Sequence, residues 1–324
     1  MCGIVAYTGS ADAVPILLKG LKSLEYRGYD SAGLAILEDN DLRLFREVGR
    51  VQQLTKAVPQ DLQGQTGIAH TRWATHGGVT RENAHPHLDD SQRIAVVHNG
   101  IIVNVGVLRE RLEEEGVVFR SETDSEVLVH LVEEYHQEGL LQAVKEALLA
   151  VQGTYGIAVL SADHPGKVVI AAKGSPLILG IGEKGIWAAS DVCALVSHTR
   201  EVVYLHDDDL VLIDSEGYQI SNLHSQDISR PKRTIDWDIK AAEKQGYPHF
   251  MLKEIHEQPQ AVRNAMRGRL LQAEGMPKLG GLRDVWKQIV DMERLFIVSC
   301  GTSYYAGLLG RYIIEESTDI AVEV

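Results

Sequence analysis

The stretch MCGIVAYTG, residues 1–9, places a cysteine directly behind the first methionine and ahead of an apolar run, Ile4–Tyr7. The apolar run predicts a buried strand. Two interpretations of Cys2 are open. It is either a small buried strand residue, because free cysteine is among the most buried residue types, or the first residue of a processed chain. In the second case, removal of Met1 gives Cys2 both a thiol and a free α-amine, which pairs a nucleophile with its own terminal base.

Composition bounds the class of protein. A length of 324 residues predicts about two domains, and a hydrophobic content of 44% is enough for a packed core. The net charge of −13 speaks against a general binder of nucleic acid or anionic membranes. We find no run of about 18 apolar residues and no leader, so we expect no membrane association and a cytoplasmic location. The cysteines Cys2, Cys193 and Cys300 are few and widely spaced, which is typical of a reducing compartment.

Residues 1–225 are predicted to form one mixed α/β domain. Hairpin-linked strands together with grouped helices favour layered sheets with helices on the outside. The expected helices are 14–26, 121–139 and 140–153, and the expected strands are 4–7, 31–37, 66–73, 92–103 and several short runs between 154 and 214.

Residues 226–249 are polar, contain Pro231 and Pro248, and are predicted to be a linker. Residues 250–324 begin a second domain. We expect a helix there that Pro259 bends or restarts, and then a strand, a tight turn, a helix and a strand. A single parallel βαβ unit cannot cover both faces of its sheet. We therefore expect the sequence to be part of a longer protein.

The pair Asn99-Gly100 ends an apolar strand in VVHNG. A side-chain amide and a glycine N–H could together stabilise an oxyanion next to an attacking thiol. Asn-Gly is also a common turn pair, and both interpretations are open at this point.

Two charged residues could bind a free amino acid. Arg72, in HTRWATHGG, could fork onto a carboxylate. Asp124, in SETDSEV, could hold an ammonium group, but Ser121, Thr123 or Asp124 could equally cap the helix that follows.

Five histidines fall in one segment and raise the question of a metal: His70, His76, His85, His87 and His98. No cysteine or carboxylate joins them at a zinc-like spacing, so we expect no metal site. Further on, SCGTSYYAG follows a strand and opens a helix. Thr302 and Ser303 there could meet a phosphate or simply cap the helix.

Together these motifs resemble a known family. MCGIVAYTG, LEYRGYDSAGLA, HTRWATHG, NAHPH, VVHNGII and SETDSEV are similar, in order, to the glutaminase domain of the glutamine–fructose-6-phosphate aminotransferases. KEIHEQP and CGTSYYAG resemble the start of the sugar isomerase domain of the same family. The resemblance covers nearly the whole chain. It implies an N-terminal-nucleophile four-layer αββα sandwich over 1–225, the linker over 226–249, and the incomplete start of an α/β sugar isomerase domain over 250–324.

The resemblance also implies an activity. The family hydrolyses L-glutamine and passes the ammonia through an internal channel onto fructose 6-phosphate, which yields glucosamine 6-phosphate and glutamate. It implies no metal and no cofactor, no nucleic-acid or membrane partner, and a homodimer for the full-length protein. For this chain alone we expect glutaminase activity only.

Residue roles follow where the motifs match. Cys2 is implied as the nucleophile with its α-amine as the base, and Asn99 and Gly100 as the oxyanion hole. The α-groups of glutamine are implied to be bound by Arg72, Thr75, His76 and Asp124.

Other residues are implied to have supporting roles. Trp73 belongs to the loop that gates the channel, Arg27 supports the N-terminus, and Thr302 and Ser303 take the sugar phosphate. One departure is the stretch 103–105, Val-Asn-Val, where the family usually has Glu-Asn and then a polar or aromatic residue. We expect this departure to change local packing or surface contacts, and we expect no effect on the role of Cys2.

Two other interpretations compete. An amidophosphoribosyltransferase or asparagine synthetase type of amidotransferase shares the Cys-Gly start and the Asn-Gly pair, but TRWATHG and CGTSYY do not suit it. A non-enzymatic sugar-phosphate sensor would not need an intact set of Cys2, Arg72, Asn99 and Asp124.

Overall fold

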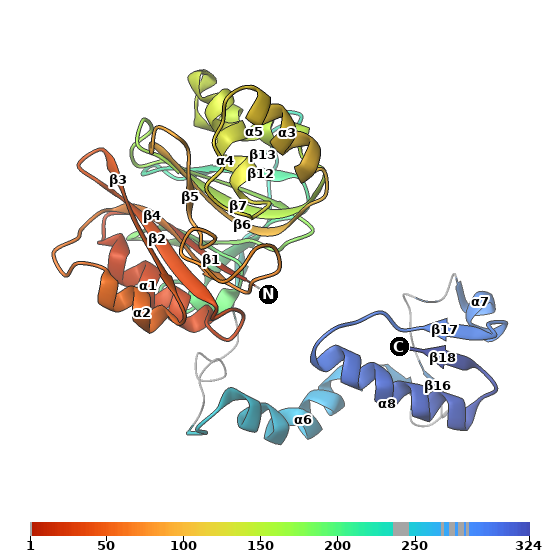
Figure 1. Cartoon of the computed structure of the whole chain (residues 1–324). Coiled ribbons are helices and arrows are strands. Elements are labelled where there is room, and N and C mark those ends of the chain that lie inside the picture. The colour runs from red at the N-terminus through yellow and green to blue at the C-terminus, as the bar shows by residue number, and fades with distance from the viewer. Residues whose placement is uncertain (1, 236–245, 267–268, 272–275, 278–281, 283–284) are drawn as a thin grey trace. The chain divides into compact units, whose positions relative to one another are not determined.

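A computed structural model describes residues 2–235, 246–266, 269–271, 276–277, 282 and 285–324. The chain divides into two compact units, Met1–Glu243 and Lys244–Val324 (Figure 1), which are described separately. The short strand β14 (Arg233–Thr234) pairs with β11 (Glu201–Tyr204), and Ile235 is 3% exposed within the core of the first unit. The first unit therefore includes the beginning of the predicted linker, and residues 236–245 of that linker lie outside the described residues.

Two antiparallel sheets form the centre of the first unit. The eight-stranded sheet has the order β14-β11-β9-β10-β1-β4-β2-β3, and the six-stranded sheet has the order β13-β12-β8-β7-β6-β5. Their other strands are β1 (Gly3–Gly9), β2 (Ser31–Glu38), β3 (Asp41–Val48), β4 (Thr66–Arg72), β5 (His87–Leu88), β6 (Ile94–Ile102), β7 (Gly153–Ser161), β8 (Val168–Lys173), β9 (Ile178–Gly182), β10 (Gly185–Ala189), β12 (Asp209–Ile213) and β13 (Tyr218–Asn222).

Helices cover the outer face of each sheet. The first pair is α1 (Ala13–Leu24) and α2 (Val51–Ala57), and the second group is α3 (Val105–Glu114), α4 (Glu126–Glu134) and α5 (Leu140–Ala150); short 3₁₀ turns lie at His136–Glu138 and Val192–Ala194. Figure 1 shows the two groups on opposite sides of the sheets.

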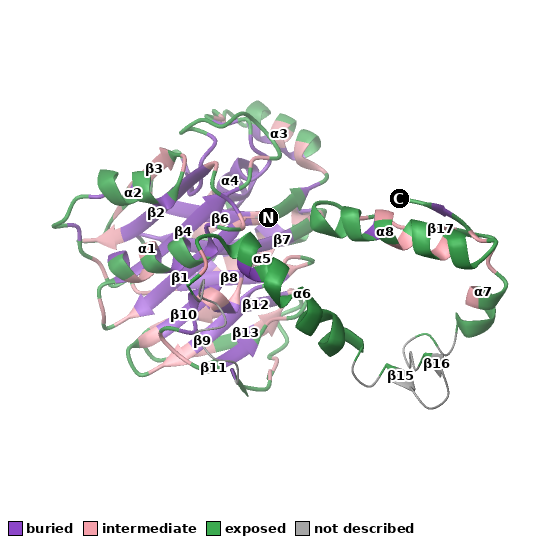
Figure 2. Cartoon of the chain, turned by 90° about the horizontal axis from the view of Figure 1, so that it is seen from below, coloured by how far each residue is buried: buried purple, intermediate pink, exposed green. Residues whose placement is uncertain are grey.

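The alternation of side chains along β1 explains the layering. Val5 and Tyr7 belong to the core under α1 and α2, whereas Ile4 and Ala6 belong to the core between the two sheets. A third core lies between the six-stranded sheet and α3, α4 and α5. Figure 2 shows the buried strands between helices whose outward sides are exposed. The predicted four-layer αββα sandwich is confirmed.

The second unit contains α6 (Phe250–Met266), β15 (Leu270–Leu271), β16 (Met276–Pro277), α7 (Trp286–Val290), β17 (Arg294–Phe296), α8 (Thr302–Ser317) and β18 (Ala321–Glu323). β17 and β18 are parallel and α8 connects them, as the predicted βαβ unit requires. α6 runs through Pro259 as one helix, so the predicted restart does not occur. Among the described helices, none combines the length and apolarity needed to span a bilayer.

Candidate active site

The candidate site lies where β1, β4 and β6 meet. Cys2 immediately precedes β1, and residue pairing sets Gly3 opposite Thr71 on β4. Beyond the end of β4, the backbone N–H of Trp73 donates to Cys2 Sγ over 3.2 Å. Gly3 must lack a side chain, because a Cβ there would lie 2.7 Å from Thr71 Oγ1 and 2.8 Å from Leu24 Cβ. The sequence thus brings the thiol against the start of the 73–80 loop.

Burial raises the pKa of the Cys2 thiol, although the Trp73 N–H donor and the nearby Arg72 charge act in the opposite direction. At neutral pH the thiol is therefore largely protonated and needs a base to become a nucleophile. Among the described side chains, no imidazole or carboxylate is hydrogen-bonded to Cys2 Sγ. This geometry fits a base carried by Cys2 itself.

Asn99 and Gly100 lie within β6, opposite Gly156 and Tyr155 of β7, so they do not form a turn. Gly100 has φ +142°, and a Cβ at this position would lie 2.0 Å from the Thr154 carbonyl oxygen. Only glycine fits this backbone. The Asn99 side chain reaches across to Cys2, where its Nδ2 donates to the Cys2 carbonyl oxygen over 3.3 Å.

Arg72 is buried, and its guanidinium donates to backbone carbonyls of the loop that follows it. The acceptors are Gly78 O at 3.0 Å, Gly77 O at 3.4 Å and, in a shorter contact, His76 O. Burial lowers the pKa of Arg72, while the charges of Cys2 (when it is ionised), Asp30 and Asp124 raise it. Arg72 therefore shapes the loop as well as bringing positive charge to the site.

Asp124 is buried and does not cap a helix, since α4 begins only at Glu126 and its N-cap is Ser125. Asp124 Oδ2 accepts the backbone N–H of Ile102 over 2.9 Å. This bond joins the loop before α4 to β6, two residues beyond Gly100. The Asp124 carboxyl group is thus held close to Asn99 and Gly100 in the fold.

The remaining predicted residues are placed as follows. Trp73 is 44% exposed and packs edge-on against Tyr29, and Thr75 and His76 lie exposed on the loop. Arg27 donates to Ser190 O and to Asp191, each over 3.0 Å. Ser190 in turn bonds the backbone of Ile4, so Arg27 does support the first strand.

In the second unit, Thr302 and Ser303 are the first two residues of α8 and are exposed. The N-cap position belongs to Gly301. The capping alternative for these two hydroxyl residues is therefore not observed.

Of the five histidines in the 70–98 segment, four are buried and pack on one another or on hydrogen-bond partners: His70, His85, His87 and His98. Burial lowers the pKa of each, to about 3 for His70 and His87. These rings are neutral parts of the core beneath the site.

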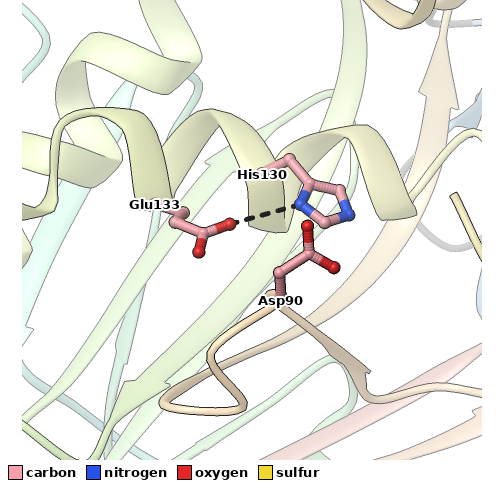
Figure 3. Close-up of side chains that lie close together, drawn as sticks. All are labelled: Asp90, His130 and Glu133. Carbon is pink, nitrogen blue, oxygen red and sulfur yellow. Dashed lines mark hydrogen bonds and ion pairs between the residues drawn. The ribbon is translucent and has the colours of Figure 1, made fainter. Parts of the chain in front are cut away.

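Another cluster in the described part of the chain consists of Asp90, His130 and Glu133 (Figure 3). Each side chain has one atom that could bind a metal ion, and these three atoms lie within 4.8 Å of one another. Burial alone would lower the pKa of His130, but Glu126 and Glu133 raise it to about 9. With its pKa raised, the imidazole is protonated at neutral pH. Its Nδ1 lies 3.3 Å from Glu133 and its Nε2 lies 3.9 Å from Glu126, so His130 forms ion pairs with these two carboxylates.

Two positioning residues were not predicted from the sequence. Asp30 accepts the Ala74 N–H over 2.9 Å and donates its own N–H to Arg72 O over 3.0 Å. Glu122 Oε2 accepts from Gly78 N and from Asn83 Nδ2, each over 3.0 Å. Both carboxylates lie inside motifs already noted, YRGYD and SETDSEV, but only the fold shows that they hold the 73–80 loop.

Comparison with known proteins agrees with this geometry. Residues 70–197 match a glutamine amidotransferase domain family. Along its full length the chain is 45% identical to a glutamine–fructose-6-phosphate aminotransferase (isomerizing) of Chlorobaculum tepidum and 47% identical to one of Thermus thermophilus, covering 54% and 53% of those proteins. The chain thus spans about half the length of these curated relatives.

Solved structures share the fold. A glutamine phosphoribosylpyrophosphate amidotransferase from B. subtilis aligns with a TM-score of 0.61 at 25% identity, over 68% of this chain and 49% of that one. An allosteric regulatory enzyme of purine biosynthesis aligns with the same TM-score and coverage at 28% identity. The sandwich, the domain match and the similarity along the whole of this chain all relate it to glutamine amidotransferases, and its curated relatives are named glutamine–fructose-6-phosphate aminotransferases.

Proposed function

We propose that the first unit hydrolyses the side-chain amide of L-glutamine through Cys2. The observation that carries this proposal is that an amide donor on one sheet lies next to the cysteine at the start of the other sheet. Asn99 Nδ2 is 3.3 Å from the backbone carbonyl oxygen of Cys2. An oxygen that develops negative charge next to this thiol would lie within reach of the same donor.

The chemistry needs two steps. Once Met1 is removed, the α-amine of Cys2 accepts the thiol proton, and Sγ attacks the amide carbon of glutamine. Asn99 Nδ2 and the Gly100 N–H stabilise the oxyanion, and the collapse of the tetrahedral intermediate breaks the C–N bond, with the α-amine returning its proton to the leaving ammonia. Water then hydrolyses the thioester to glutamate and restores the thiol.

Recognition of glutamine rests on opposite charges at the two sides of the site. Arg72 is proposed to bind the α-carboxylate and Asp124 the α-ammonium group, with Thr75 and His76 completing the pocket and Trp73 covering it. Both charged residues are buried, so a ligand charge would meet them in a setting of low polarity.

For the full-length protein we propose transfer of the ammonia to fructose 6-phosphate, which gives glucosamine 6-phosphate. The full-length relatives carry this activity in their name. Thr302 and Ser303 open the 16-residue helix α8, where hydroxyls and free N–H groups suit a phosphate. We further propose that the full-length protein is a homodimer in the cytoplasm. The proposed domain organisation is a glutaminase domain over 1–225, a linker over 226–249 and the start of a sugar isomerase domain over 250–324.

The amidophosphoribosyltransferase alternative is supported by one solved structure at 25% identity. The relatives that match the whole of this chain are 45% and 47% identical to it. A glutaminase assay with Cys2→Ala as control tests the first unit. We expect glutamate release that the substitution abolishes. Release that persists in Cys2→Ala would overturn the proposal, and so would a wild-type chain that releases none.

A further inference from the structure

We infer that His70 is a positioning residue for the oxyanion donor, because its Nε2–H fixes the Asn99 side chain so that the amide nitrogen faces Cys2. This inference deepens the proposed function and rests on it. His70 lies on β4 of the eight-stranded sheet and Asn99 on β6 of the six-stranded sheet, so their contact bridges the two layers.

The direction of this hydrogen bond follows from the neighbouring acceptor. His70 Nε2 lies 3.1 Å from the backbone carbonyl oxygen of His98 and 3.0 Å from Asn99 Oδ1. A backbone carbonyl can only accept, so Nε2 must carry the ring proton. The Nε2–H proton also points at the Asn99 side chain, where only the amide oxygen Oδ1 can accept it. With Oδ1 facing His70, the amide nitrogen Nδ2 faces Cys2.

The imidazole is held in place on its other side. His70 is 1% exposed, and its ring stacks on His85 with centroids 4.2 Å apart and an interplanar angle of 14°. His85 is itself fixed, because its Nδ1 accepts the His98 N–H over 3.2 Å. Burial lowers the pKa of His70 to about 3, which keeps the ring neutral near neutral pH. The two oxygen acceptors at Nε2 then hold the neutral ring in the Nε2–H tautomer.

A positioning role makes a definite kinetic prediction. Removal of one oxyanion donor lowers kcat by about 10²–10³. A variant that keeps the donor but lets it rotate should therefore show a smaller loss of kcat. We expect His70→Leu to lower kcat for glutamine hydrolysis about 10- to 100-fold with KM for glutamine nearly unchanged. His70→Gln, whose amide N–H can replace Nε2–H, should recover most of this loss.

The decisive measurement is a double-mutant cycle with Asn99→Ala. If His70 acts through Asn99, His70→Leu should add almost no further loss in the Asn99→Ala background. Equal losses in both backgrounds would overturn the inference.

Ile68→Ala is the matched control, since Ile68 lies two residues away on β4 in the core between the sheets. This variant should lose stability while its kcat stays near that of the wild type.

A second readout requires neither activity nor a folded variant. In wild-type protein labelled with ¹⁵N-histidine, we expect His70 to show the neutral Nε2–H tautomer unchanged from pH 5 to 9. The Nδ1–H tautomer, or titration in this range, would contradict the inference. If Asn99→Ala leaves glutamine hydrolysis unaffected, the oxyanion role in the proposed function fails, and that result is distinct from a failure of the His70–Asn99 bond.

Discussion

At the scale of single residues, the site depends on groups that tolerate no substitute. Cys2 supplies a thiol whose pKa burial raises, and Gly100 occupies a backbone conformation closed to other residues. The motifs predicted both residues. The sequence could not predict why Gly100 is needed, because the limiting contact is with Thr154, which lies 54 residues further along the chain on strand β7.

Blocking the α-amine tests the base. We expect insertion of one alanine between Met1 and Cys2 to lower kcat by about 10²–10⁴, the usual contribution of a general base. Intact mass should show that the native chain has lost Met1. An inserted variant that hydrolyses glutamine as fast as the trimmed chain would show that the α-amine is not the base.

Gly100→Ala tests the strained position. The φ of +142° and the clash with the Thr154 carbonyl should cost about 1–3 kcal/mol of unfolding free energy and move the oxyanion donor. We expect at least a tenfold loss of kcat, measured beside thermal unfolding. Gly106→Ala is the control: nothing lies within 4 Å of the added Cβ in helix α3, so it should leave stability unchanged or raise it by up to about 1 kcal/mol. Equal behaviour of the two variants would contradict the account of Gly100.

At the scale of elements, the sequence predicted long amphipathic or apolar segments and missed weakly patterned ones. The strand β3, the helix α2 and the helix α3 were not predicted. α3 buries only Leu108 and Leu112 among its residues and opens with β-branched valines, so its helical pattern is faint. The departure at 103–105 lies at its start, where Val103 is exposed and Val105 packs against the core.

The helix α4 contains a charge cluster with a predictable pH dependence. His130 is 3% exposed, and its carboxylate partners raise its pKa from 6.5 to about 9. A group with a raised pKa stabilises the folded state fully below its unfolded pKa, and this contribution is lost as pH rises through 9. His130→Gln should therefore cost about 1–3 kcal/mol at pH 6 and less at pH 9.5.

Urea unfolding across this pH range measures the effect of His130→Gln. His136→Gln serves as the control, because its partner Asp163 is 40% exposed and such a pair contributes less than about 1 kcal/mol. If the cost of His130→Gln did not change with pH, the imidazole would not be charged in the folded protein.

At the scale of the whole molecule, the two units differ in how well they cover their apolar residues. The first unit encloses three buried cores. In the second unit, Phe296, Val298, Tyr305 and Tyr312 are exposed, with Val298 at 96%. The sequence predicted this contrast, because a lone parallel βαβ unit leaves sheet faces open.

We expect this chain to release glutamate from glutamine without forming aminosugar. The reason is that it spans about half of its full-length relatives and its second unit contains one pair of parallel strands among the described residues. Incubation with glutamine and fructose 6-phosphate, with glutamate and glucosamine 6-phosphate measured separately, tests this. Aminosugar formed in step with glutamate would show that the sugar site is complete in these residues.

Cys2 and Asn99, the proposed nucleophile and oxyanion donor, come from different layers and are 97 residues apart in the chain. During synthesis the thiol therefore leaves the ribosome long before its partner does. Until the second sheet docks on the first, the thiol lacks the Asn99 donor that the proposed hydrolysis needs. Hydrolysis of glutamine should therefore return in refolding only after the two sheets have docked, so activity would report the assembly of the sandwich.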